Sequence, residues 1–316
     1  MRVIITGATS MIGVALIGQC LQRGHSVLAL VRANTRRMNR LPVSGNLSVE
    51  YVDLDTFERV QGDGMPYDVC YHLAWGSTEK SVRDNPTAQE RNIRATLDAV
   101  QMAHRLGCRK FIGAGSQAEY GPVEGIISAD TAPNPVSAYG MAKLSACLLS
   151  RKLCEQYGMQ HIWGRIFSVY GCNDNEGTML NYAIDRFLAG KPAQFSAATQ
   201  MWNYLHETDA GAMFYLLGRK PVEPGIYCVA NPESEVLRTY IEILKDEFGS
   251  KAQCEFAPPG ADHKIFGLNV DMKKTVEAIG YTPQVSFREG IRNMIQARRR
   301  VAGAASSGIE GHEHGE

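Results

Sequence analysis

Six short apolar runs alternate with longer helical patterns over the first half of the chain. They lie at residues 3–5, 26–31, 47–52, 69–73, 110–114 and 161–166, and they are rich in β-branched and other apolar residues. Apolar runs without polar alternation are typical of strands buried on both faces, and regular alternation with helices is typical of βαβ units. The sequence therefore predicts an α/β fold with a doubly wound parallel sheet.

This rhythm changes after about residue 166. Residues 167–300 contain many turn-forming Asn, Asp and Pro residues with helical stretches between them. We therefore expect a main domain over residues 1–166 and a smaller α/β lobe over 167–300, some of whose segments return to the sheet. Residues 301–316 are small, Gly-rich and polar, which predicts a flexible tail in which His312 and His314 are solvated and bind no metal.

Charge, hydropathy and cysteine spacing restrict the class of protein. The 33 Lys and Arg residues balance 33 Asp and Glu residues, so we expect no nucleic acid or anionic membrane as a partner. No apolar stretch approaches the roughly 20 residues of a membrane span, and the N-terminus has no signal pattern, which predicts a cytoplasmic protein. The 8 cysteines form no CxxC pair, which favours buried, reduced thiols over disulfides or a zinc site.

The first apolar run leads directly into the sequence TGATSMIG at residues 6–13. A strand, a tight glycine turn and a helix form the unit that binds a dinucleotide pyrophosphate in Rossmann-type folds. Gly7 permits the turn, Gly13 lets the helix pack close to the strand, and the amides at the helix N-terminus attract an anion. Ser10 replaces the middle glycine of the full fingerprint and offers its hydroxyl to a phosphate. The other expected cofactor contacts in this loop are Thr9, Met11 and Ile12.

TGATSMIG resembles the TGxxGxxG loop of short-chain dehydrogenases/reductases, and in particular the extended branch with the sugar-nucleotide epimerases and dehydratases. The resemblance covers about residues 1–300. It implies that Asp53, after the third strand, lies beside the adenine. The segment YHLAWGS resembles the HLAA segment that flanks the cofactor, with Trp75 as a bulky departure. The cofactor contacts expected on these strand ends are Asp53, Leu54, Leu73, Ala74, Trp75 and Ile166.

The loop after the second run bears on the choice of nicotinamide cofactor. In Rossmann-type folds a carboxylate at this strand end holds the ribose 2′-hydroxyl of NAD, whereas arginine accommodates the 2′-phosphate of NADP. Residues 32–37 read RANTRR, so Arg32 and Arg36 are present and no acid is near. The sequence predicts NADP in preference to NAD, with a solvated basic turn as the alternative.

Tyr139 and Lys143 lie four residues apart in SAYGMAKLSA, on one face of an expected helix. An ammonium close to a phenol lowers the phenol pKa from about 10 toward neutrality, so Tyr139 becomes usable as acid or base in hydride transfer. Ser116 in FIGAGSQAEYG resembles the family serine that hydrogen-bonds the substrate oxygen, and the resemblance gives Lys143 the nicotinamide ribose. We therefore expect Ser116, Tyr139 and Lys143 to be the catalytic residues. Asn92 resembles a supporting helix asparagine of the family.

The residues after Ser116 separate the branches of the family. The 4,6-dehydratases carry an Asp-Glu pair there as acid and base, whereas this chain has Gln117 and Ala118. A glutamate typical of the decarboxylases also falls on Ala118, and Glu119, one place along a strand end, is expected to point to the opposite side. Dehydration is therefore disfavoured. Hydride transfer at a sugar carbon remains, as 4-epimerisation or 4-keto reduction, and the arginine-rich loop favours reduction modestly.

Two later segments resemble the part of the family that binds the nucleotide sugar. RIFSVYG resembles RxxNVYGP with Ser168 in place of Asn, and QMWNYLHETDAG resembles RDYIHVxDxA. Trp202 stands where an arginine normally grips the pyrophosphate, so it either stacks on a ring or packs in the lobe. The substrate contacts expected are Gln117, Ser168, Asn181 and Trp202.

The missing arginine leaves open a carbonyl reductase that acts on a substrate without a nucleotide. A non-catalytic NADP-binding sensor is less favoured, because Tyr139 and Lys143 are both present. The apolar stripes at residues 93–103 and 144–153 are compatible with plain core. The equivalent helices of the family pair across a twofold axis, so the resemblance implies a homodimer.

Overall fold

The computed structural model describes residues 1–258 and 266–307. Its centre is a parallel sheet of seven strands in the order β12-β7-β5-β4-β1-β2-β3. The strands are β1 (Arg2–Thr6), β2 (Ser26–Val31), β3 (Leu47–Tyr51), β4 (Val69–His72), β5 (Lys110–Ser116), β7 (Gln160–Ile166) and β12 (Gly225–Val229). The strand order reverses between β1 and β4, as it does in Rossmann-type sheets. The predicted doubly wound fold and its six strands are confirmed.

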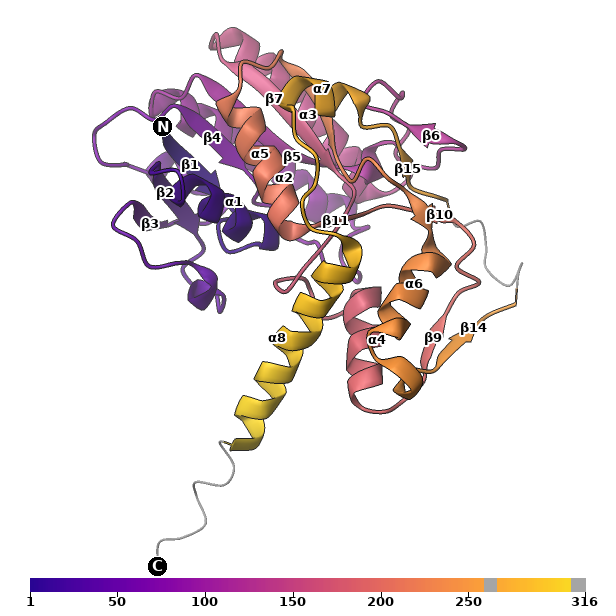
Figure 1. Cartoon of the computed structure of the whole chain (residues 1–316). Helices are drawn as coiled ribbons and strands as arrows, with labels where there is room; N and C mark the ends of the chain where they lie inside the picture. The colour runs from indigo at the N-terminus through magenta and orange to yellow at the C-terminus, as the bar shows by residue number, and fades with distance from the viewer. Residues whose placement is uncertain (259–265, 308–316) are drawn as a thin grey trace, which may run out of the picture.

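Helices cover both faces of this sheet (Figure 1). On one face α1 (Met11–Leu21) packs against α5 (Glu207–Arg219), and on the other α2 (Pro86–Arg105) packs against α3 (Ala138–Gln156). Along β1, Val3 and Ile5 belong to the core on the α1 side, whereas Ile4 belongs to the core on the α2 side. Both faces of β1 are therefore buried, which explains why it reads as a continuous apolar run. The edge strand β3 is by contrast largely exposed.

The second part of the chain builds a smaller lobe around its own core. Tyr170, Leu180, Ile241 and Ile291 are among the buried residues of this core. Its helices are α4 (Met179–Leu188), α6 (Leu237–Asp246) and α8 (Phe287–Ser307). Its strands are β8 (Ser168–Tyr170) with β11 (Tyr204–His206), β9 (Ala193–Phe195) with β14 (Cys254–Phe256), and β10 (Met201–Trp202) with β13 (Glu235–Val236).

Two segments from beyond residue 166 belong to the main layer structure. Helix α5 lies against α1, and β12 extends the sheet beside β7. The remaining elements are β6 (Ile126–Ile127) with β15 (Asn269–Val270), α7 (Lys273–Ile279), and the 3-10 helices η1 (Met38–Arg40), η2 (Phe57–Arg59), η3 (Gln117–Glu119) and η4 (Gly249–Lys251). Among the helices described, none is long and apolar enough to cross a membrane.

The C-terminal segment differs from its prediction. Helix α8 projects from the body in Figure 1 and continues to Ser307, so residues 301–307 are helical although they were predicted as part of a flexible tail. Their sequence VAGAASS contains three alanines, the residue with the highest helix propensity, which explains the extension. Residues 308–316, including His312 and His314, lie outside the described residues. The cysteines that are buried, as predicted, are Cys20, Cys70, Cys108, Cys147, Cys154 and Cys228.

Candidate functional site

The turn after β1 brings the ends of two strands together. Gly7 has a φ of +66°, and a Cβ at this position would lie 2.7 Å from the backbone nitrogen of Ala74. A Cβ at Gly13 would collide with the carbonyl oxygen of Gly7, so α1 approaches the turn closely only with glycine there. Ser10 caps α1, with its Oγ accepting from the Gly13 amide at 3.1 Å, and the first turn of α1 holds no acid. The turn at Gly7 and the N-terminus of α1 together form a glycine cradle. This cradle fits a dinucleotide pyrophosphate.

The end of β4 is tied to the same turn. Thr6 Oγ1 accepts a hydrogen bond from the Ala74 amide at 3.1 Å and lies 3.0 Å from Nδ1 of His72. Burial lowers the pKa of His72 to about 3, so this imidazole is neutral. Beside it, a Cβ at Gly76 would lie 3.2 Å from the side chain of Leu54. The strand ends at this edge of the parallel sheet also carry the predicted contacts Asp53, Leu73 and Ile166.

The basic loop after β2 reaches across to the smaller lobe. Arg37 Nη2 donates to Asn175 Oδ1 at 3.2 Å, and Arg40 Nη1 donates to the carbonyl oxygen of Asn173 at 3.0 Å. The predicted substrate contact Asn181 is buried, and its amide nitrogen donates to the carbonyl oxygen of Asn175 at 2.8 Å. The contact between this loop and the smaller lobe is therefore held by Arg37, Arg40 and Asn181.

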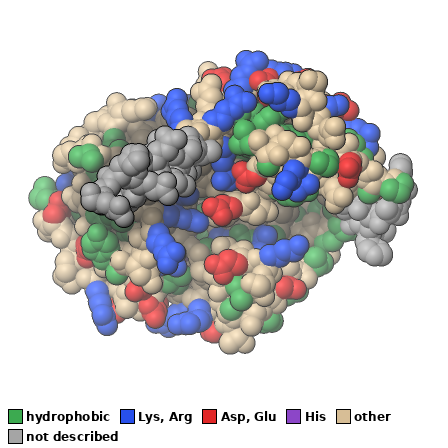
Figure 2. Space-filling view, turned by 90° about the horizontal axis from the view of Figure 1, so that it is seen from below, with side chains coloured by type: hydrophobic (Ala, Val, Ile, Leu, Met, Phe, Trp, Pro, Cys, Tyr) green, Lys and Arg blue, Asp and Glu red, His purple; other side chains and the backbone are tan. Residues whose placement is uncertain are grey.

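Arg32 and Arg36 lie in the same loop after β2, and both side chains are exposed. The molecule is hollowed on the face in Figure 2, with Lys and Arg side chains along the hollow and Asp and Glu among them. An anion on this face would therefore be bound by individual basic groups and not by a uniformly positive surface.

Helix α3 places Lys143 beneath the end of β5. The side chain is 4% exposed, and its Nζ donates to the carbonyl oxygen of Ala114 at 2.6 Å. Burial lowers the pKa of Lys143 to about 7, the carboxylate of Glu119 opposes this shift, and the charge of Arg83 adds to it. The ammonium is therefore close to its titration point at neutral pH.

Trp75 lies against both catalytic side chains predicted on α3. The Lys143 Nζ is 3.6 Å from the centroid of the indole ring and 5.9 Å from the centroid of the Tyr139 ring. The indole meets the Tyr139 ring edge to face at 6.0 Å, and its Nε1 donates to Gln89 Oε1 at 2.9 Å. The sequence marked Trp75 as a departure within HLAW, but it gave no signal that the ring covers the lysine.

Asn92 fixes the loop on which this tryptophan stands. Its Oδ1 accepts from the Gly76 amide at 2.7 Å, and its Nδ2 donates to the Gly76 carbonyl oxygen at 3.2 Å. Gln89 Nε2 donates to the carbonyl oxygen of Ser77 at 2.8 Å, where the backbone adopts a positive φ of 54°. Helix α2 therefore holds the loop after β4 from below, in keeping with the supporting role predicted for Asn92.

The environment of Tyr139 differs from the prediction. Burial raises the pKa of Tyr139, whereas Arg83 and Ser116 lower it by charge and hydrogen bonding. The expectation that Lys143 lowers this pKa is wrong here, because its ammonium binds the carbonyl oxygen of Ala114 and turns to the tryptophan. Arg83 was not singled out from the sequence, since it lies in a loop without a motif. Its Cζ stands 4.1 Å from the centroid of the Tyr139 ring.

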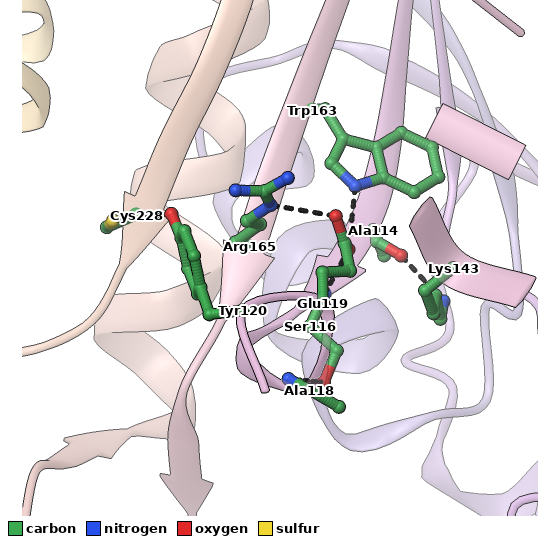
Figure 3. A network of polar contacts seen from close by, with 9 residues as sticks. All are labelled: Ala114, Ser116, Ala118, Glu119, Tyr120, Lys143, Trp163, Arg165 and Cys228. Atoms are coloured by element: carbon green, nitrogen blue, oxygen red, sulfur yellow. Dashed lines mark hydrogen bonds and ion pairs between the residues drawn. The ribbon is translucent and has the colours of Figure 1, made fainter. Parts of the chain in front are cut away.

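A buried ion pair lies behind Ser116 (Figure 3). Glu119 and Arg165 have side chains only 0% and 1% exposed, and Arg165 Nε donates to Glu119 Oε2 at 2.7 Å. The other carboxylate oxygen, Oε1, accepts from the amide of Ser116 at 2.8 Å and from Trp163 Nε1 at 2.9 Å. Glu119 therefore joins the backbone of the predicted catalytic serine to the core of the sheet.

The position of Glu119 follows from the 3-10 helix η3. Strand β5 ends at Ser116, whose side chain caps η3, so strand alternation does not continue into residues 117–119 as expected. The tight turn directs Glu119 into the core, while Gln117 and Ala118 line a hollow of about 600 Å³ together with Arg83. Glu119 does point away from the side of Ala118, but the reason is this turn.

The other two predicted substrate contacts lie in the smaller lobe. Ser168 begins β8 and is partly buried. Trp202 is packed between the main core and the core of the lobe, with its ring 6.4 Å from that of Tyr204. The structure therefore gathers Ser116, Gln117, Tyr139 and Lys143 at one edge, and it gives Trp202 a packing role.

Sequence comparison finds relatives along almost the whole chain. The chain is 24% identical to UDP-glucuronic acid decarboxylase 1 of Arabidopsis thaliana, over 93% of this chain and 69% of that protein. It is also 24% identical to UDP-glucuronate 4-epimerase of Thermodesulfobacterium geofontis, over 92% of this chain and 94% of that protein.

Solved structures share the fold. UDP-N-acetylglucosamine 4-epimerase from Methanobrevibacter ruminantium superposes with a TM-score of 0.83 at 20% identity, over 95% of this chain and 98% of that one. UDP-glucuronic acid 4-epimerase from Bacillus cereus, solved in complex with NAD, gives a TM-score of 0.79 at 20% identity over 96% and 98% of the two chains.

Family assignment agrees with the glycine cradle and with the seven-stranded sheet. Residues 3–230 match the sequence model of the family described as the NAD dependent epimerase/dehydratase family. This match spans the glycine loop, Ser116, Tyr139 and Lys143, and it reaches into the lobe. The chain therefore belongs to the NAD-dependent epimerase/dehydratase family of extended short-chain dehydrogenases/reductases.

Proposed function

We propose that this enzyme transfers a hydride reversibly at a ring carbon of a nucleotide sugar, as a 4-epimerase or a 4-ketoreductase. One observation carries the proposal: Ser116, Tyr139 and Lys143 converge at the end of β5, at the same sheet edge as the glycine cradle. The 4-epimerases among the relatives support it. In this proposal the lobe after residue 166 holds the nucleotide.

The catalytic roles follow from the chemistry of each group. When bound, a nicotinamide dinucleotide supplies the acceptor or donor of hydride. Tyr139 takes the proton of the substrate hydroxyl on oxidation and returns a proton to the carbonyl oxygen on reduction. Ser116 hydrogen-bonds the same oxygen, and its backbone is fixed by Glu119. Lys143 binds the nicotinamide ribose, and Ala114 orients its ammonium.

Water loss has little support at this site. Gln117 and Ala118 occupy the wall of the hollow where the 4,6-dehydratases carry their acid and base. The nearby carboxylate of Glu119 is buried and bound to Arg165, Trp163 and the Ser116 amide. The proposal therefore disfavours 4,6-dehydration.

We also propose NADP as the preferred cofactor. Arg32 and Arg36 are exposed after β2, where NAD-binding members of the fold use a carboxylate, and these arginines suit a 2′-phosphate. NAD is the alternative, since structures of relatives contain it. Exposed leucines on α3 support a homodimer, and the buried free thiols are compatible with the cytoplasmic location that we propose.

The test is direct. The protein is incubated with NADP⁺ or NADPH and a panel of UDP-, dTDP-, CDP- and GDP-sugars, and products are followed by absorbance of the reduced cofactor and by NMR. Tyr139→Phe should bind NADP normally and lose turnover about 10² to 10⁴-fold, because only proton transfer is removed. Failure of every nucleotide sugar, with turnover of simple carbonyl compounds, would favour a carbonyl reductase, to which the packed Trp202 in place of an arginine points.

A further inference from the structure

A guanidinium lies over the ring of Tyr139. It belongs to Arg83, in the loop between β4 and α2, and its Cζ is 4.1 Å from the centroid of the ring. The Nζ of Lys143 is 5.9 Å from the same centroid, and it is only 3.6 Å from the centroid of the Trp75 ring. Lys143 also donates to the carbonyl oxygen of Ala114 at 2.6 Å. Of these two cations, Arg83 is therefore the closer to the ring of Tyr139.

The charge of Arg83 is not neutralised by a carboxylate. The ion pairs in the described part of the chain do not include this side chain. The neighbouring acid, Asp84, accepts a backbone amide hydrogen at the start of α3 at 2.7 Å. The carboxylate of Glu119 acts on the phenol from η3, but its charge is compensated by Arg165 at 2.7 Å. The positive charge of Arg83 is therefore available to the phenol.

The two cations respond differently to pH. Burial lowers the pKa of Lys143 to about 7, so its ammonium loses its charge as the pH rises above neutrality. A guanidinium keeps its charge throughout this range. A tyrosinate carries its negative charge on the oxygen and partly on the ring, so a permanent cation over the ring stabilises the tyrosinate relative to the neutral phenol. In keeping with this, burial raises the pKa of Tyr139, the charge of Arg83 lowers it, and a hydrogen bond with Ser116 lowers it further.

Resting on the proposed function, in which Tyr139 accepts the proton of the sugar hydroxyl, we propose that Arg83 and not Lys143 stabilises the tyrosinate form of Tyr139. Arg83 acts through Tyr139 and is therefore a positioning residue. The two cations then have different roles. Lys143 binds the nicotinamide ribose, whereas Arg83 keeps Tyr139 usable as a base at a pH where Lys143 has lost its charge. Because Arg83 is exposed, water screens part of its effect.

The experiment titrates Tyr139 directly and needs no substrate. Every tyrosine is replaced biosynthetically by 3,5-difluorotyrosine, whose more acidic phenol titrates in the range of the folded protein, and fluorine NMR spectra are recorded from about pH 5.5 to 9.5. The resonance of residue 139 is the one that Tyr139→Phe removes. Arg83→Gln should raise its pKa by about one unit, and Arg83→Lys should keep it within about half a unit of the wild type. Lys80→Gln removes a charge from the same loop and should shift it by less than about 0.3 unit.

Lys143→Gln separates the two cations, because it should raise the pKa of residue 139 by less than Arg83→Gln does. A larger rise in Lys143→Gln would overturn the proposal, and so would an Arg83→Gln variant that titrates as the wild type does. Unchanged resonances of the other tyrosines show that Arg83→Gln is folded. If they move, Arg83→Met, which keeps an aliphatic stem over the ring, takes its place. The expected shifts in a protein that turns over no nucleotide sugar or carbonyl compound would support the role of Arg83 and refute the proposed function.

Discussion

The ammonium of Lys143 lies 3.6 Å from the centre of the Trp75 ring, closer than it lies to the ring of Tyr139. The face of an indole stabilises a cation, most strongly where water is excluded. Burial lowers the pKa of Lys143 to about 7, and the tryptophan therefore opposes this effect. Because Gln89 holds the indole nitrogen, the ring is fixed in this position.

We predict that Trp75→Leu lowers the pKa of Lys143 further, by about one unit. The charged ammonium of Lys143 is lost as pH rises through this pKa, and this group is proposed to bind the nicotinamide ribose. NADP binding to the variant should therefore weaken at a lower pH than binding to the wild type. Binding is measured by fluorescence of the reduced cofactor from about pH 5.5 to 8.5. Trp75→Phe keeps an aromatic face and should retain most of the wild-type profile. If NADP binding to the Trp75→Leu variant weakens at the same pH as in the wild type, the indole does not raise the pKa of Lys143.

Glu119→Gln tests the ion pair behind Ser116. Gln keeps an oxygen for the Ser116 amide and the Trp163 indole, but it removes the charge that compensates the buried Arg165. Removing one partner of a buried pair typically costs about 3 to 5 kcal/mol, so the free energy of unfolding in urea should fall by about that amount. Glu124→Gln, on an exposed side chain, is the matched control and should change it by less than about 0.5 kcal/mol. If the free energy of unfolding of the Glu119→Gln variant falls by less than about 1 kcal/mol, the carboxylate does not compensate the buried charge of Arg165.

Arg32→Ala tests the choice of cofactor. The variant should bind NADP about tenfold or more weakly and bind NAD as the wild type does, because only NADP carries the 2′-phosphate. Arg37→Ala is the control, since its guanidinium holds Asn175 of the smaller lobe and its loss should affect both cofactors equally. Dissociation constants for the two reduced cofactors give the comparison. Equal weakening of NADP and NAD by Arg32→Ala would refute the preference.

The sequence allowed the sheet to be predicted because its inner strands, such as β1, β4 and β5, are buried on both faces and therefore read as apolar runs. Strand β12 was not identified by its residues, because its partner β7 lies some 60 residues earlier and the intervening chain is rich in turns. The glycine loop was readable since Gly7 and Gly13 are required by close backbone contact.

The roles of three residues around the site could not be predicted from the sequence. They are Glu119, Arg83 and Lys143. Glu119 is directed into the core by the 3-10 helix η3, which follows β5 directly and interrupts strand alternation at residues 117–119. Arg83 reaches Tyr139 from a loop without a motif, and the orientation of Lys143 depends on Trp75, which is 68 residues away in the chain. Contacts of this kind are set by the packing of loops on the sheet, and no local pattern encodes them.

Leu148 and Leu149 on α3 test the homodimer. Their exposed fractions are 45% and 49%, and Met141, two turns earlier, is 51% exposed, so α3 carries an apolar stripe on the surface. Burying this stripe against a second copy would stabilise a dimer by removing apolar area from water. Sedimentation equilibrium at micromolar concentrations should give a dimer for the wild type and a monomer for Leu148→Glu. Leu188→Glu, at an exposed leucine of α4, should remain dimeric. A monomeric wild type would refute the prediction.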